Sequence, residues 1–174
     1  MIKNNLFDFY HFIEKPLIDV VASMEKNGFK INEHQLEDLS IQFSDKLKNI
    51  EKKIYDISKE EFNVGSAKQL GEVLFEKLHL PHGKKGKSGN YQTDVKVLEK
   101  LKNEKIEIAS LVLDWRQFSK LKNTYCEGLI SRKNQTTNRI HTSFGMASTL
   151  TGRLSSNDPN LQNIPIKNIE GRQI

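Results

Sequence analysis

The sequence predicts a mainly α-helical fold: a long antiparallel helical hairpin with a helical tip, followed by a small region of strand and loop. Apolar residues recur at intervals of three and four from Leu36 to Ile57 and again from Ile108 to Leu129, which is the spacing of amphipathic helices. Only 36% of the residues are hydrophobic, and the mean hydropathy is −0.59. These values favour an elongated helical shape over one compact sphere. Two seams of similar length predict long helices at about 32–60 and 105–130, packed at a shallow angle.

A shorter helix is expected before the hairpin, between Leu6 and Asn27. Its apolar side chains recur at helical spacing, Pro16 suits a first helical turn, and Gly28 is a typical C-terminal stop. Residues 29–31 are then expected to form an extended connector.

The first long helix has a clear start. Asn32 is a good N-cap and Gln35 stands three residues later, as in a capping box. Ile31 before the cap and Leu36 after it are placed to form a hydrophobic staple. The sequence therefore predicts a stable helix beginning close to residue 32.

Residues 62–101 are predicted to form the helical tip. Ser66 and Gln69 make a second capping box, and apolar positions continue from there to Leu78. The start of such a helix offers free backbone N–H groups and partial positive charge, which suit a phosphate. Lys68 in the first turn opposes the helix dipole, so it fits best beside a bound phosphate. The alternative is an exposed lysine without a partner.

A basic, glycine-rich loop over residues 82–90 contains Lys84, Lys85 and Lys87, and we expect it to contact phosphate groups. Its Gly-Lys-Ser sequence is similar to the end of a nucleotide-binding P-loop. However, Pro81 occupies the first glycine position and no strand precedes it, so no nucleotide site is predicted. Residues 91–93, ending in Thr93, are expected to cap a short helix.

Three further segments can be interpreted from the sequence. Arg116 and Lys120 lie four residues apart, so they share one face of the second long helix, beside its apolar seam. Residues 139–144 alternate and predict one strand. Residues 151–165 are too polar for a core, and Pro159 and Pro165 exclude a long helix there.

The polar segment 151–165 is built around one arginine. Gly152 permits a turn or a close approach just before Arg153, and hydroxyl and amide side chains surround both. This composition suits a surface that meets another polar polymer. The alternative is a loop whose amides satisfy its own backbone.

Charge is unevenly distributed along the chain. Residues 1–83 hold 11 basic and 14 acidic residues, whereas residues 84–174 hold 16 basic and 8 acidic ones. The second half therefore favours a polyanionic partner, although lysines that only solvate helix faces are the alternative. Cys126 is the single cysteine, which excludes a disulfide framework. With no membrane-length apolar run and no signal-peptide pattern, we expect a cytoplasmic protein and no membrane partner.

Three segments carry a resemblance to a known family. Residues 151–165, TGRLSSNDPNLQNIP, resemble the segment that enters the palm of family A DNA polymerases, the bacterial DNA polymerase I family. Residues 62–70, FNVGSAKQL, are similar to its thumb-tip motif, and residues 115–125, WRQFSKLKNTY, to the end of its second thumb helix. The resemblance covers nearly the whole chain and implies a DNA-directed DNA polymerase of replication and repair.

The resemblance also implies an organisation and a chemistry. Residues 1–31 would begin the polymerase domain, 32–130 would form the thumb, and 131–174 would begin an incomplete palm. In the family, the carboxylates that hold two magnesium ions and the helix that binds deoxynucleotides follow later in the chain. We therefore expect no catalytic residue, metal site or cofactor in this chain, magnesium and deoxynucleotides as requirements of the full-length polymerase, and a monomer.

Gripping primer–template DNA is the function left to this chain. The resemblance implies that Arg153 lies in the minor groove at the primer terminus, where a donor-only guanidinium meets acceptors on every base pair. The predicted DNA-binding residues are Asn63, Gly65, Ser66, Lys68, Lys84, Lys85, Lys87, Thr93, Arg116, Lys120, Arg153, Asn160, Gln162 and Asn163. The alternatives are a stand-alone helical nucleic-acid-binding module and a helical-hairpin scaffold for a protein partner.

Overall fold

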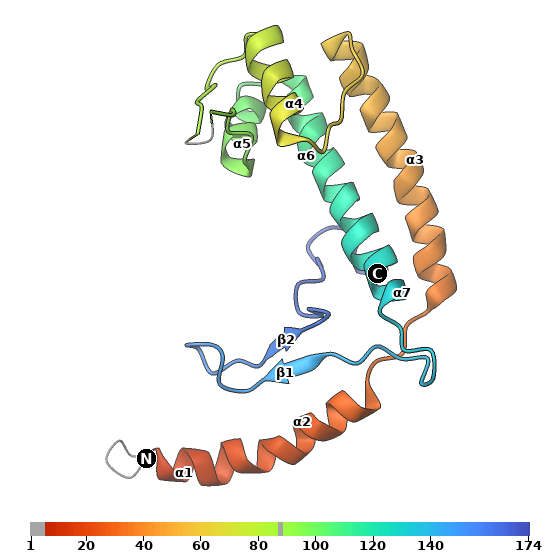
Figure 1. Ribbon diagram of the computed structural model, residues 1–174, viewed down its shortest axis with the longest axis vertical. Helices are drawn as coiled ribbons and strands as arrows, with labels where there is room; N and C mark the ends of the chain where they lie inside the picture. Colours follow the sequence, from red (N-terminus) through yellow and green to blue (C-terminus); the bar gives the residue numbers. More distant parts are fainter. Residues whose placement is uncertain (1–5, 87–88) are drawn as a thin grey trace. The chain divides into compact units, whose positions relative to one another are not determined.

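The computed structural model describes residues 6–86 and 89–174. The fold is mainly helical with one small two-stranded sheet, which confirms the predicted fold class (Figure 1). Two compact units can be separated: residues up to Asp38 together with Tyr125–Ile174, and Leu39–Thr124. The division of the chain into subdomains at residues 1–31, 32–130 and 131–174 stays a prediction.

The predicted hairpin is present. Helix α3 spans Glu33–Ser58, and α6 spans Glu107–Lys120 (Figure 1). Helical structure continues beyond α6 through the π-helical segment η4, Leu121–Glu127, and α7, Gly128–Ser131. The predicted limits of both long helices are therefore correct to within two residues, because a repeated apolar seam is a local signal that needs no tertiary information.

Side-chain contacts show that the two helices run antiparallel. The Trp115 indole Nε1 donates to Glu51 Oε1 at 2.9 Å. The rings of Phe43 and Phe118 lie 5.7 Å apart between centroids. Later positions on α6 thus meet earlier positions on α3, and the aromatic side chains expected to be core do pack in the seam.

The tip is built by α4 (Ala67–Glu72), the π-helical η3 (Val73–Lys77) and α5 (Val95–Asn103), beside α6 (Figure 1). One apolar cluster joins them to the end of α3: Ile54, Val64, Leu70, Leu74, Phe75, Leu98, Leu101, Ile108, Ala109 and Val112. A Cβ at Gly71 would lie 2.8 Å from the Tyr91 Cβ, so glycine permits the close approach of this chain segment to α4.

The caps differ in detail from the predicted ones. Asn32 Oδ1 accepts the Gln35 N–H at 3.3 Å, and Ser66 Oγ accepts the Gln69 N–H at 3.5 Å, as expected. The cap of α5 was wrongly placed on residues 91–93: Asp94 is the N-cap, with its Oδ1 accepting the Val97 N–H at 3.0 Å. A carboxylate one residue further along supplies the acceptor, which frees the preceding residue for other contacts.

The first unit contains a continuous helical run formed by α1 (Phe7–Phe9), the π-helical η2 (Tyr10–Glu14) and α2 (Lys15–Asn27). Pro16 therefore lies inside this run instead of at its start. Gly28 ends the run with a φ of +62°, as predicted for a C-terminal stop. A Cβ at Gly28 would lie 2.6 Å from the Ile140 carbonyl oxygen, so the chain can pass closely only with glycine here.

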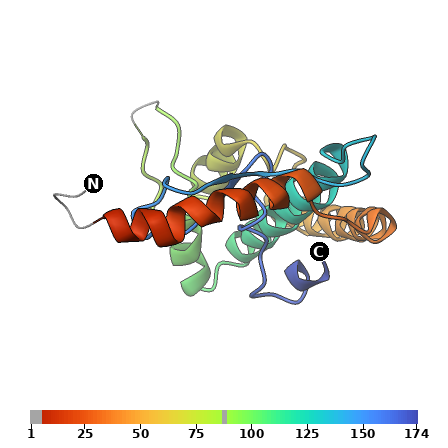
Figure 2. The same ribbon diagram turned by 90° about the horizontal axis from the view of Figure 1, so that it is seen from below.

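The strand predicted over residues 139–144 is wrong in its extent. Strand β1 comprises only Ser143–Gly145, and it pairs antiparallel with β2, Ser155–Asn157, inside the segment expected to be irregular. Ile140 instead forms an isolated bridge with Phe29. Figure 2 shows α2 running along the strand pair, where the Phe144 N–H donates to Glu25 Oε1 at 2.6 Å. Pairing between distant segments is a tertiary effect that alternation alone does not reveal.

A short 3-10 helix, η5 (Gly171–Gln173), lies near the last described residue. Within residues 6–86 and 89–174, no helix is long and apolar enough to cross a membrane.

Candidate nucleic-acid interface

Arg153 lies in the loop that connects β1 to β2. Its side chain is exposed, and within the described part of the chain its guanidinium has no hydrogen bond or ion pair. Its backbone is held, because Thr149 Oγ1 donates to the Arg153 carbonyl at 2.8 Å. Gly152 has a φ of +71° and open space around the missing Cβ, so it serves the turn and not a close approach. The loop thus offers an unpaired cation on a defined backbone.

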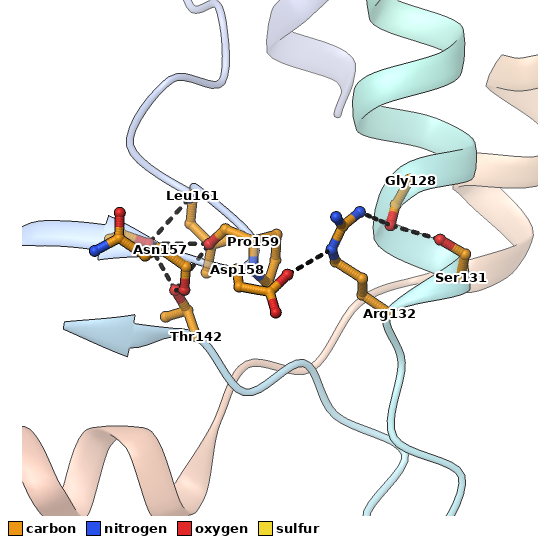
Figure 3. Close-up of polar contacts among 9 residues, drawn as sticks. Gly128, Ser131, Arg132, Thr142, Asn157, Asp158, Pro159 and Leu161 are labelled. Carbon is orange, nitrogen blue, oxygen red and sulfur yellow. Dashed lines mark hydrogen bonds and ion pairs between the residues drawn. The ribbon is translucent and has the colours of Figure 1, made fainter.

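A polar network joins Thr142, just before β1, to β2 and to the turn that follows it (Figure 3). Thr142 Oγ1 lies 2.8 Å from Ser156 Oγ, 2.9 Å from the Asn157 carbonyl and 2.8 Å from the Pro159 carbonyl. Ser156 Oγ also accepts the Leu161 N–H at 3.1 Å. These contacts hold the backbone on both sides of the turn that follows β2.

An ion pair joins the same turn to α7 (Figure 3). Arg132 Nε donates to Asp158 Oδ1 at 3.1 Å, and both side chains are largely exposed. An exposed pair of this kind contributes about 0–1 kcal/mol. The ion pair therefore adds little to the stability that the buried network gives this turn.

Within residues 151–165, two of the three amide side chains predicted to contact DNA bond to their own segment. Asn160 Oδ1 accepts the Gln162 N–H at 3.0 Å, and Gln162 Nε2 donates to the Leu154 carbonyl at 2.7 Å. At Asn163 the main-chain carbonyl accepts a hydrogen bond from the Tyr125 hydroxyl. The Asn163 side chain is exposed, and its amide has no internal partner in the described chain. Internal bonding, the second sequence-based alternative, therefore describes Asn160 and Gln162, and contact of Asn163 with DNA stays a prediction.

The tip loop likewise satisfies much of itself. Asn63 Oδ1 accepts the Gly65 N–H at 2.9 Å, and Gln69 Oε1 accepts the Asn63 N–H at 2.7 Å. The Ser66 hydroxyl oxygen accepts the N-cap hydrogen bond of α4. Lys68 alone among these residues extends an exposed, unpaired charge within the described chain.

The basic loop and α5 together line a cavity of about 250 Å³. Its lining includes three lysines, Lys84 from the loop and Lys96 and Lys100 from α5, and one carboxylate, that of Asp94. None of the three lysines has an ion pair within the described residues, and we call this the basic cavity. Lys85 instead pairs with Glu76 at 3.5 Å and lies over the Tyr91 ring at 4.6 Å. Lys87 lies outside the described residues.

Sequence reasoning missed Lys96 and Lys100. The signal was available, because the two lysines stand four residues apart on a short amphipathic helix and so share a face. What the sequence did not reveal is that this face turns toward Lys84, since that depends on how the loop folds back along the helix.

Arg116 points into the tip. Its Nη1 donates to the Thr93 carbonyl at 2.5 Å and its Nη2 to Thr93 Oγ1 at 3.2 Å, and Thr93 is only 5% exposed. Burial lowers the pKa of Arg116, while the nearby Asp94 carboxylate opposes that shift. The predicted row of Arg116 and Lys120 therefore consists of one internally bonded side chain and one exposed lysine. Their contact with DNA stays a prediction.

A second hollow of the same unit has the opposite charge. It measures about 670 Å³ and is lined by Glu60, Glu61, Glu72 and Glu76, with Lys77 the one cation in the lining. Such a surface does not suit a phosphate. Within the described residues, no group of three or more His, Cys, Asp or Glu side chains could hold a metal ion.

Comparison with known proteins assigns the chain to a family. The family model described as DNA polymerase family A matches residues 33–174. The chain is 48% identical to DNA polymerase I of Caldicellulosiruptor bescii, covering 95% of the chain and 19% of that protein. It is 45% identical to DNA polymerase I of Bacillus subtilis, covering 98% of the chain and 19% of that protein.

A solved structure agrees. The POL domain of Pol1 from M. smegmatis, in complex with DNA primer-template and dNTP, matches with a TM-score of 0.80 and 37% identity, covering 92% of this chain and 28% of that one. The chain thus spans about a fifth of the length of the curated relatives named above. Sequence, family model and fold agree that the chain belongs to DNA polymerase family A.

Proposed function

We propose that this chain is the part of a DNA-directed DNA polymerase that grips primer–template duplex. The observation that carries the proposal is Arg153: an exposed, unpartnered guanidinium on a hairpin whose backbone is bonded on both sides. A donor-only group of this kind can bond the acceptors that every base pair presents in the minor groove. It would therefore test the geometry of the last pair without reading its sequence.

The tip and the end of α6 would supply sequence-independent affinity. Lys68, Lys84, Lys96, Lys100 and Lys120 are exposed cations without partners among the described residues. If about four of them each neutralise one phosphate, the logarithm of the affinity falls with the logarithm of salt concentration at a slope near −3.6. This dependence separates the proposal from a scaffold that binds only protein.

The solved relative supports the proposed partners. The M. smegmatis structure holds primer-template DNA and dNTP, and we extend both partners to the whole polymerase of which this chain forms part. The whole protein would transfer nucleotidyl groups in DNA replication and repair in the cytoplasm, with magnesium as its divalent metal. We assign no catalytic step to this chain.

The test compares Arg153→Ala with Lys30→Ala, which removes the same charge from another exposed position of the same unit. Affinities are measured on a duplex with a recessed primer end and on a blunt duplex of equal length. We expect Arg153→Ala to weaken recessed-end binding by about tenfold, the equivalent of ~1.4 kcal/mol for a lost charged hydrogen bond. Equal losses on the two duplexes would contradict the proposed role.

A further inference from the structure

The hairpin that carries Arg153 is short. Strands β1 and β2 share the three residue pairs Ser143–Asn157, Phe144–Ser156 and Gly145–Ser155. An isolated two-stranded hairpin is marginally stable in water at best, and this one is shorter than a typical strand pair. Its position must therefore be fixed by contacts beyond its own ladder.

Two buried hydroxyl groups lie at the base of this hairpin. Thr142, just before β1, is 2% exposed, and Ser156, in the middle of β2, is 1% exposed. Their oxygens are 2.8 Å apart, and together they contact the carbonyls of Asn157 and Pro159 and the N–H of Leu161 (Figure 3). The pair joins the two ends of the hairpin to each other and to the following turn.

The hydrogens on these groups can be counted. Leu161 donates to Ser156 Oγ, so the serine hydroxyl proton is free to point at Thr142 Oγ1 or at the Pro159 carbonyl. The threonine proton then points at the Asn157 or the Pro159 carbonyl. Each hydroxyl has a single proton. Removal of either oxygen therefore takes a hydrogen bond away from a part-buried backbone group: a carbonyl for Thr142 and the Leu161 N–H for Ser156.

We propose that Thr142 and Ser156 are positioning residues that hold the β1–β2 hairpin so that Arg153 is presented to the end of a bound duplex. The proposal rests on the proposed function of Arg153. Neither hydroxyl is exposed to a ligand, so both act through the loop. The exposed Arg132–Asp158 pair contributes less, since water competes for both of its charges.

The first test needs no DNA. Amide hydrogen exchange is measured in the 174-residue chain for Thr142→Val, which keeps the shape and loses the hydroxyl. We expect exchange at Leu161 and residues 152–157 to become about tenfold faster, as a lost buried hydrogen bond favours local opening. Exchange in α2, which belongs to the same unit as the hairpin, stays unchanged, which shows that this unit of the variant is folded.

Matched variants sharpen this test. Thr142→Ser retains the hydroxyl and is expected to keep exchange close to that of the unchanged chain. Thr136→Val makes the same chemical change at an exposed threonine whose hydroxyl has no partner in the described chain, and should leave the hairpin unaltered. Should Thr142→Val fail to fold, Ser156→Ala removes the other oxygen and less volume. Unchanged hairpin exchange in the folded hydroxyl-free variant overturns the proposal.

The second test links the pair to Arg153 through a double-mutant cycle on recessed-end DNA. If Thr142 acts through Arg153, Thr142→Val weakens binding in the unchanged chain by several-fold but adds no further loss to Arg153→Ala. Additive losses would overturn the inference while leaving the role of Arg153 intact. If Arg153→Ala itself shows no end-specific loss, the proposed function fails, and the exchange result alone decides whether the hydroxyl pair orders the hairpin.

Discussion

The tip and the β1–β2 hairpin achieve order by opposite means. In the tip, buried apolar residues such as Leu70, Leu74 and Leu98 form one continuous cluster. In the hairpin, the buried side chains are the hydroxyl residues Thr142 and Ser156. Apolar burial is non-directional and stabilises a body, whereas hydrogen bonds are directional and fix the path of a backbone.

This difference matches what each region presents. The tip carries several lysines on long flexible side chains, which suits contact with phosphates whose exact positions vary along a duplex. The hairpin carries one guanidinium on a bonded backbone, which suits a single fixed contact. A region that binds through net charge can be stabilised by an apolar core, because the exact position of each lysine matters little. A region that binds through one side chain needs hydrogen bonds that fix the backbone carrying that side chain.

The largest effect is expected from breaking the apolar cluster of the tip. Leu74 is fully buried, and Leu74→Ala should lower the free energy of unfolding by about 2–5 kcal/mol through lost contacts and a cavity. Leu150→Ala, the same change at a fully exposed residue of the hairpin loop, should leave it within about 0.5 kcal/mol. Urea unfolding followed by circular dichroism measures both. Equal effects would mean that the cluster is not what stabilises the tip.

A pH-dependent effect of intermediate size is expected in the unit that contains the hairpin. Burial, and to a smaller extent Glu127, raise the pKa of Cys126 from 9.0 to about 11. A raised pKa favours the neutral thiol in the folded state, so the contribution is fully present below about pH 9 and is lost between pH 9 and 11. The unfolding free energy should therefore fall by about 1–2 kcal/mol more than in Cys126→Ala across that window. An identical decline in both proteins would contradict a buried neutral thiol.

The same contrast explains what the sequence could predict. Helices α3 and α6 followed from repeated apolar spacing, and the caps at Asn32 and Ser66 from residues three positions apart. All of these are local signals. The apolar residues of the tip could be assigned to a core for the same reason.

The hairpin was less accessible to prediction. Strand β2 was missed because its pairing with β1 joins residues about twelve apart, and the polar side chains around it conceal the pattern. The internal bonding of Arg116 to Thr93 was missed because it links residues 23 positions apart. Arg153 could be predicted as a site residue from its setting in the sequence, and that role stays a prediction. The buried hydroxyl residues Thr142 and Ser156 resemble ordinary polar residues in the sequence.

A smaller effect distinguishes structural from exposed arginines in the two units. Arg116→Lys keeps the charge but loses the forked contact with Thr93, so we expect a loss of about 1 kcal/mol in unfolding free energy. Arg132→Lys alters only an exposed ion pair and should change stability by less than about 0.5 kcal/mol. Chemical denaturation of both variants is the measurement. A larger loss of unfolding free energy for Arg132→Lys than for Arg116→Lys would show that the exposed ion pair contributes more to stability than the partly buried hydrogen bonds of Arg116.

The smallest effect on folding, and a distinct one on binding, is expected from the lysines of the basic cavity. Lys96→Gln with Lys100→Gln removes two unpaired exposed charges, so stability should change little. If both lysines neutralise phosphates, the salt slope of duplex binding becomes shallower by about 1.8. The matched pair Lys102→Gln with Lys105→Gln removes the same charge from exposed positions outside the cavity and should change the slope less. If the tip acts through charge alone, the reduction should be the same on recessed and blunt duplexes, unlike that of Arg153→Ala. An end-specific loss would contradict the proposed difference in role between the tip and the hairpin.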